Sequence, residues 1–158
     1  MFGAQKAGVY GAVAVLGLFG GVLDPITGLL GGDSGSSSGA TRPTAAQWKT
    51  MGSTWAKWKR TLASGCHSYR YTYTVKPPAA AGKQWELETF LVGPRGGHLG
   101  SDVIIGGADP KHGAKSWRIC RSNTVPGTFT INARLSYKID PDEYSGSLKA
   151  RHFRLVRP

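Results

Sequence analysis

Residue types that could support catalysis or metal binding are few in this chain and widely separated. Four histidines occur, and none stands at a metal-ligand spacing such as His-x-His or His-Glu-x-x-His. They are His67, His98, His112 and His152. A Gly-x-Ser-x-Gly motif at Gly35–Gly39 lies in a Gly- and Ser-rich stretch without a preceding strand or a following helix, so it does not indicate a catalytic serine.

Two groups of carboxylates could do chemistry. Glu86 and Glu88 are two residues apart in a predicted strand, so both project from one face and could form a carboxylate pair, although a Lys or Arg of a neighbouring strand is the commoner partner. Asp140, Asp142 and Glu143 fall in one predicted turn and could bind Ca²⁺, although polar turn residues explain the same pattern. The sequence therefore predicts no catalytic residue, metal or cofactor, and does not favour an enzyme.

The charge of the chain favours attraction to polyanions. The formal net charge is +11, and residues 41–158 carry nineteen Lys and Arg against seven Asp and Glu. Such an excess suits an anionic envelope polymer, a lipid surface, nucleic acid or a partner protein, but scattered basic residues that keep a protein soluble give the same total. A short cluster of Lys57, Lys59 and Arg60 provides the candidate polyanion contacts.

The N-terminal region has the layout of an export signal. Residues 7–23 contain no charge and follow a single lysine, Lys6. Residues 1–30 are predicted as a cleaved signal peptide or an N-terminal membrane anchor, with a buried helix of a cytosolic protein as a third interpretation. Residues 31–46 are rich in Gly and Ser and are predicted to be a flexible linker. The first two interpretations place a folded domain of residues 47–158 outside the cytoplasm, extracellular or envelope-anchored, which argues against nucleic acid as its partner.

The two cysteines, Cys66 and Cys120, are predicted to form a disulfide, because paired cysteines in an exported chain are usually oxidised. The alternation of side chains predicts where the bond lies. Tyr69, Tyr71 and Tyr73 are odd-numbered and Cys66 is even-numbered, so in an unbroken strand the cysteine faces away from the tyrosines. We therefore expect the bond to join strand ends at the rim of the domain, rather than the centres of two sheets.

The segment Gln47–Ser64 has two competing interpretations. Its apolar residues recur at a spacing of three or four, which predicts one face of a helix capped by Thr44. These residues are Trp48, Met51, Trp55, Trp58 and Leu62. Gly52 weakens the helix, and Trp55–Leu62 fits a strand equally well, with a short helix or turn before it. We expect the indoles to cover the open end of the core, although Trp beside Lys could also bind sugars or a membrane surface.

The rest of the chain alternates between apolar and polar residues at the period of β-strands. Predicted strands occupy Cys66–Val75, Trp85–Val92, Leu99–Ile105, Ser116–Cys120, Thr128–Ile139 and Ser147–Val156. Turn signals rich in Gly and Pro separate them. Six or seven short strands in this arrangement predict an all-β fold, an antiparallel β-sandwich with one core.

Four motifs in this layout carry a resemblance. They are Gly65-Cys-x-x-Tyr69, Trp85-x-Leu87, Gly93-Pro-Arg-Gly96 and Pro126-Gly-Thr-Phe-Thr-Ile131. In this order, the region 65–158 resembles the small immunoglobulin-like β-sandwich modules of secreted actinobacterial proteins. The resemblance implies a fold and an extracellular location but no chemistry, since most such modules have a binding function or an unknown one. It also implies a core tryptophan between the cysteines, at Trp85 or Trp117.

Two functional hypotheses follow from these features. The first is an exported, non-catalytic binding or structural module that contacts an anionic polymer, a lipid surface or a partner protein through its basic surface. The second is a secreted hydrolase or enzyme inhibitor whose active residues lie in the loops at residues 93–97 and 106–113, since loops carry most functional residues. A convergent site in those loops would distinguish the second hypothesis from the first.

Overall fold

Alternating buried and exposed residues carry the chain through two β-sheets. The computed structural model describes residues 41–158, so the predicted signal or anchor and most of the predicted linker lie outside the described residues. The elements are α1 (Ala45–Trp48), β1 (Gly52–Trp55), β2 (Lys59–Thr61), β3 (Cys66–Val75), η1 (Ala79–Ala81), β4 (Trp85–Val92), β5 (His98–Ile105), β6 (His112–Cys120), β7 (Gly127–Ile139), β8 (Asp142–Ser147) and β9 (Arg151–Val156).

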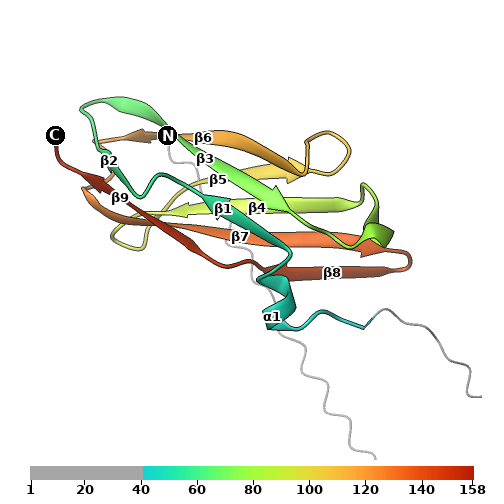
Figure 1. Cartoon of the computed structure of the whole chain (residues 1–158). Helices are drawn as coiled ribbons and strands as arrows, with labels where there is room; N and C mark the ends of the chain where they lie inside the picture. The colour runs from blue at the N-terminus through green and yellow to red at the C-terminus, as the bar shows by residue number, and fades with distance from the viewer. Residues whose placement is uncertain (1–40) are drawn as a thin grey trace, which may run out of the picture. The chain divides into compact units, whose positions relative to one another are not determined.

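The two sheets face each other (Figure 1). One sheet has the strand order β1-β3-β6, and the other has the order β2-β9-β7-β4-β5, with β8 also paired to β7. All pairings are antiparallel except that of β2 with β9, which is parallel. The prediction of a mostly β fold is therefore confirmed. The N-terminal segment crosses between the sheets, because β1 belongs to the first sheet and β2 to the second.

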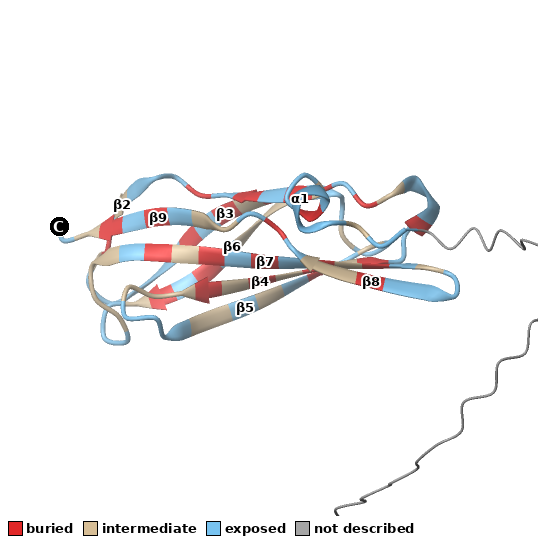
Figure 2. Cartoon of the chain, turned by 90° about the horizontal axis from the view of Figure 1, so that it is seen from below, coloured by how far each residue is buried: buried red, intermediate tan, exposed pale blue. Residues whose placement is uncertain are grey.

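The inward-facing residues of both sheets form two buried clusters, and the resulting alternation is visible along β7 and β9 (Figure 2). In one cluster, the ring of Tyr71 stacks on Trp117 with centroids 3.8 Å apart. The Tyr71 hydroxyl shares a 2.9 Å hydrogen bond with the Thr89 hydroxyl and donates to Asp102 Oδ2 at 3.1 Å. These contacts join the two sheets at one level, about midway along β3.

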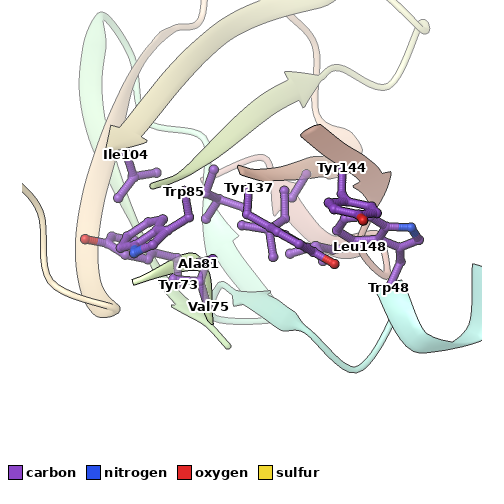
Figure 3. Close-up of a cluster of buried hydrophobic side chains, with 12 residues drawn as sticks. Trp48, Tyr73, Val75, Ala81, Trp85, Ile104, Tyr137, Tyr144 and Leu148 are labelled. Atoms are coloured by element: carbon purple, nitrogen blue, oxygen red, sulfur yellow. The ribbon is translucent and has the colours of Figure 1, made fainter. Parts of the chain in front are cut away.

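The second cluster contains the residue that docks the short helix. Thr44 caps α1, as predicted, since its side chain accepts a hydrogen bond from Gln47 N–H and Gln47 Oε1 accepts one from Thr44 N–H. Trp48 is 5% exposed and packs against Tyr137 and over Gly146 (Figure 3). Glycine at position 146 leaves the space that the indole occupies.

Of the two interpretations of Gln47–Ser64, the long helix is wrong beyond Trp48, and a short helix followed by strands is closer to the structure. Strand β1 pairs with β3 and β2 pairs with β9, so edge pairing supplies the backbone hydrogen bonds that a helix would have made internally. The helical spacing of the tryptophans is therefore incidental. Trp55 and Trp58 are 54% and 58% exposed, so the expectation that all the indoles cover the core is also wrong.

The predicted disulfide is confirmed, and it lies where side-chain parity placed it. Cys66 and Cys120 are bonded and are direct cross-strand partners at the ends of β3 and β6, within one sheet. Cys66 is exposed and Cys120 is half-buried. The bond therefore pins two strand ends at the rim and does not bridge the two sheets.

Strand β8 was also missed. The predicted turn after Ile139 is much shorter, because Asp142–Ser147 forms β8 alongside β7. Its polar composition concealed it, since Tyr144 is the apolar anchor of the segment and stacks on Tyr137. The predicted last strand, Ser147–Val156, is consequently divided into the end of β8 and all of β9.

Candidate anion-binding site

The predicted polyanion contacts do not form one patch. Lys57 lies exposed between β1 and β2, and Lys59 is exposed beside Arg154, its partner in the parallel pair. Arg60 follows at the next position of β2, so its side chain leaves the opposite face of the strand and lies over the ring of Tyr69, 5.0 Å from its centroid. Strand alternation therefore separates residues that are neighbours in sequence.

A much larger concentration of positive charge comes from segments far apart in sequence. The strand register places Tyr71, Thr89 and Ala133 at one level, and this level divides the domain into a disulfide end and a β7–β8 end. The disulfide end lies at the left of Figure 1, beside the C-terminus. Asp102 pairs with Thr89 and so stands on the line itself.

No acidic side chain of residues 41–158 lies on the disulfide side of this line. Away from the line, that side carries ten basic residues, eight of them arginines: Lys57, Lys59, Arg60, Arg70, Arg95, Arg118, Arg121, Arg151, Arg154 and Arg157. Eight of the ten are exposed, the exceptions being the half-buried Arg60 and Arg151. The disulfide end therefore presents a strongly positive, arginine-rich surface.

The ion pairs of the described residues reinforce this asymmetry. Lys115–Asp109, Arg134–Glu88 and Lys138–Asp140 all lie on the line or on its β7–β8 side. There, hydrogen bonding from the Ile105 N–H, followed by the Lys115 charge, lowers the pKa of the Asp109 carboxyl. Three of the seven side-chain carboxylates of residues 41–158 are thus ion-paired locally, and none of the ten basic residues of the disulfide end takes part in these ion pairs.

Two adjoining pockets open at the disulfide end, between the β4–β5 turn and the β6–β7 loop. One has a volume of about 180 Å³ and is lined by Arg95, and the other has about 310 Å³ and is lined by Arg118 and His98. The pockets share a wall made by Leu99, Asn123 and Thr124. We call the two pockets together, between residues 93–99 and 118–125, the arginine groove.

Local backbone chemistry positions both sides of the arginine groove. In the β4–β5 turn, Gly93 N–H donates to Gly97 O and Gly96 N–H donates to Gly93 O, and Gly96 has a φ of 79°, which glycine adopts without strain. On the other side, Arg121 N–H donates to Gly65 O at 2.9 Å, directly beside the disulfide. The turn holds Arg95 outward, and the disulfide anchors the loop that follows Arg118.

Glycine at position 93 keeps the first pocket open. A Cβ atom there would lie 2.9 Å from Leu99 Cδ1 and 3.5 Å from Thr124 Oγ1. The shared wall can therefore approach the turn closely. Arginine, amide, hydroxyl and aliphatic groups line the groove together with the His98 imidazole and the disulfide-bonded Cys120, and no carboxylate of residues 41–158 does. The groove can therefore hold an anion, but it does not pair the imidazole with a carboxylate for general acid–base chemistry.

The paired glutamates face a separate, shallower cleft of about 400 Å³ on the outer face of the second sheet. Glu88 Oε2 accepts a hydrogen bond from Arg134 Nε at 2.6 Å and forms an ion pair with the same guanidinium. The expectation of a cross-strand basic partner is confirmed for Glu88. Because one carboxylate is committed to Arg134, the cleft has the arrangement of a surface ion pair on a sheet.

The remaining candidates lie apart from one another. Asp140 pairs with Lys138, and Asp142 accepts a hydrogen bond from the Tyr144 hydroxyl, so the carboxylates predicted as a calcium site have separate partners. No group of three metal-ligating side chains occurs among residues 41–158. His67 contacts Ser64 O at 2.7 Å, His152 contacts the Thr130 hydroxyl at 2.9 Å, and neither approaches a carboxylate in these contacts.

Comparisons with protein-family models, curated proteins and solved structures found no match to this chain. Within residues 41–158, no helix is long and apolar enough to cross a membrane. The disulfide is compatible with an oxidising compartment.

Proposed function

We propose that this chain is an exported, non-catalytic binding module that attaches to an anionic polymer of the cell envelope or extracellular space through its disulfide end. The observation that carries this proposal is the segregation of charge across the line through Tyr71, Thr89 and Ala133. Among residues 41–158, ten basic residues stand on one side without a single acidic side chain, which is the pattern of a surface that attracts polyanions. Scattered solubilising charge would have mixed the two signs.

The preference for arginine at this end supports recognition in addition to general attraction. Arginine presents planar, paired donors that match carboxylate, sulfate and phosphate groups, whereas lysine is a point charge. Arg95, Arg118 and Arg121 all lie on or beside the arginine groove, at strand ends or in loops. Arg95 is displayed by the β4–β5 turn, and Arg118 and Arg121 lie at the disulfide-pinned end of β6, so all three can contact a long polymer.

The strand order supports an immunoglobulin-like class for the domain. The order β1-β3-β6 corresponds to strands A, B and E of that fold, and β9-β7-β4-β5 corresponds to G, F, C and C′. Trp85 is buried on the strand equivalent to C. The disulfide departs from the antibody pattern, since it joins the equivalents of B and E within one sheet. This class fits extracellular binding modules whose loops display the site.

The hydrolase or inhibitor alternative receives less support from the loops to which it was assigned. The β4–β5 turn at residues 93–97 contributes an arginine to a groove without carboxylates. In the segment 106–113, Asp109 is occupied by Lys115 and by the Ile105 N–H. Neither loop brings a histidine and a carboxylate together, so we propose binding as the function.

Retention of the full-length chain on an immobilised anionic polysaccharide, eluted with a salt gradient, tests this proposal. The variant R95Q/R118Q/R121Q removes three charges from the disulfide end. The control K49Q/K76Q/K111Q removes three exposed charges from the other end, so both variants have the same net charge. We expect the arginine variant to elute at much lower salt and the lysine control to elute near the unmodified protein, because exposed charges act over about one Debye length, ~8 Å at physiological salt.

Two results would contradict the proposal. Equal shifts for both variants would show that only the net charge matters and that the disulfide end is not the contact surface. Retention that does not fall with salt would show that the basic residues do not drive binding.

A further inference from the structure

The arginine groove has more structure than a general positive surface requires, because its two pockets are joined by one wall and each contains an arginine. We propose that the groove binds an acidic polysaccharide lengthwise, with Arg95 and Arg118 each holding the acidic group of a different sugar residue along the chain. This inference rests on the proposed function and deepens it, since it assigns one site and one class of polymer.

The charge of the groove selects an anion in both pockets. Arg95 is exposed in the first pocket and Arg118 is exposed in the second. Neither arginine takes part in an ion pair among the described residues, and no acidic side chain lies in the lining. Two separated guanidinium groups match a ligand that repeats its acidic group along its length better than they match a single small anion.

The wall between the two arginines supplies groups suited to a sugar. Asn123 and Thr124 line both pockets, and Ser122 lines the first, so amide and hydroxyl groups are available to the ring hydroxyls of a ligand. Ser122 donates to Asn123 Oδ1 at 2.9 Å, which leaves the Asn123 amide nitrogen free to donate. Leu99 is half-buried in the same wall and offers an aliphatic surface to the C–H face of a sugar ring.

The same lining disfavours other polyanions. Single-stranded nucleic acids bind through aromatic side chains on which the bases stack, and apart from the His98 imidazole no aromatic ring lines the groove. Binding to a membrane surface is strengthened by apolar side chains that enter the lipid, and the β4–β5 turn, Gly-Pro-Arg-Gly-Gly, offers no large one. The exposed Trp55 and Trp58 flank the β1–β2 connection, and β2 is at the opposite edge of the second sheet from β5. An acidic polysaccharide is the class that fits.

Binding of defined hexasaccharides to the full-length chain, measured by titration calorimetry at fixed salt, tests this inference. The probes are a hexamer of a uronic acid, a sulfated hexamer and a neutral hexamer of the same length. The variant R95K/R118K keeps both charges but loses the paired donors of arginine. The control K59Q/R154Q removes two exposed charges from the same end but outside the groove, where Lys59 and Arg154 are strand partners.

We expect one acidic hexamer to bind and the neutral hexamer not to bind, and the preferred acidic hexamer identifies the acidic group. R95K/R118K should weaken binding about tenfold or more, since each lost charged hydrogen bond carries a large share of the recognition. K59Q/R154Q should weaken it less than about threefold, the effect of screened surface charge. Asn123→Ala, at an exposed position, should weaken binding with unchanged thermal unfolding.

The possible failures separate this inference from the proposed function. If R95K/R118K binds like the unmodified protein while K59Q/R154Q binds weakly, charge alone drives binding, and the groove is overturned while the proposed function stands. If a single-stranded oligonucleotide of equal charge, or vesicles of anionic lipid, bind more tightly than the hexamers and are weakened by R95K/R118K, the polysaccharide class is overturned. If no anionic polymer binds at all, the proposed function fails together with the inference.

Discussion

Removal of the Cys66–Cys120 bond should destabilise the domain mainly through the unfolded chain. The bond closes a loop with a sequence separation of 54 residues. Chain-entropy arguments give a contribution of about 4 kcal/mol for a loop of this size, which is a large share of the roughly 5–15 kcal/mol that stabilises an ordinary domain. The bond lies at the rim, with Cys66 exposed, so its removal opens no cavity in the core.

The test compares the variant C66S/C120S with the unmodified protein by urea unfolding, followed through tryptophan fluorescence and circular dichroism. We expect the free energy of unfolding to fall by about 4 kcal/mol and the denaturant slope to rise, because the unfolded chain without the bond is more expanded. Near-ultraviolet circular dichroism of the folded state should change little, since the paired residues of β3 and β6 between the core tyrosines and Trp117 remain.

A decrease in the free energy of unfolding of less than about 1 kcal/mol, with an unchanged denaturant slope, would refute this reasoning, because the disulfide would then constrain little of the unfolded chain. A large loss together with an altered near-ultraviolet spectrum would place the effect in the folded core instead. Reduction of the unmodified protein with a thiol should reproduce the behaviour of the variant. Affinity for the acidic hexamer should also fall, since Cys120 lines the second pocket of the arginine groove.

Three further predictions concern packing and protonation. Gly146→Ala should lower the free energy of unfolding by about 1–3 kcal/mol, because a Cβ atom at this position would overlap the ring of Trp48. Urea unfolding should show a much smaller decrease when the same substitution is made in Trp48→Ala. Burial raises the pKa of Tyr71 well above its ordinary value of 10.0. The neutral Tyr71 hydroxyl therefore contributes fully to stability below about pH 10, and this contribution is lost as the pH rises further. The melting temperature should fall between about pH 9 and 12, and it should fall less steeply with pH in Tyr71→Phe. Hydrogen bonding from the Ile105 N–H lowers the pKa of Asp109 below its ordinary value of 3.8. The ionised Asp109 carboxylate therefore contributes to stability above about pH 4, and this contribution is lost as the pH falls. In Asp109→Asn, the melting temperature should depend less steeply on pH in the acid range.

Most of the longer strands were predictable from sequence, because one face of each is buried. The unbroken alternation of Thr128–Ile139 predicted β7 almost to the residue, and the parity of Cys66 against Tyr69 predicted the rim disulfide. Both signals are local and depend only on the period of two. Alternation was less informative in β8, where one buried residue, Tyr144, accompanies polar neighbours.

The segment before β3 shows why local spacing can mislead. Trp48, Trp55 and Trp58 recur at helical intervals, but only Trp48 is buried. The two short strands that follow exist because β3 and β9 offer free edges to pair with, and the positions of those edges are a property of the whole fold. Tertiary pairing therefore overrode the spacing pattern.

The candidate site was only partly predictable. The excess of positive charge was visible in the sequence, and the predicted contacts Lys57, Lys59 and Arg60 are three of the ten basic residues at the disulfide end, but their sequence cluster did not indicate the other seven. Arg95 lies in the β4–β5 turn and Arg118 lies 23 residues later, in β6 of the other sheet, so only the fold brings them to one groove. The available signal was the absence of acidic residues from every segment that meets at the disulfide end.

Mapping the binding surface by nuclear magnetic resonance tests the central claim most directly. The isotope-labelled chain is titrated with an acidic oligosaccharide, and backbone amide shifts are followed. The account predicts that the largest changes fall in residues 93–99 and 118–125, with none of similar size at the β7–β8 end. Changes centred on the β7–β8 end, or on the cleft at Glu86 and Glu88, would contradict it.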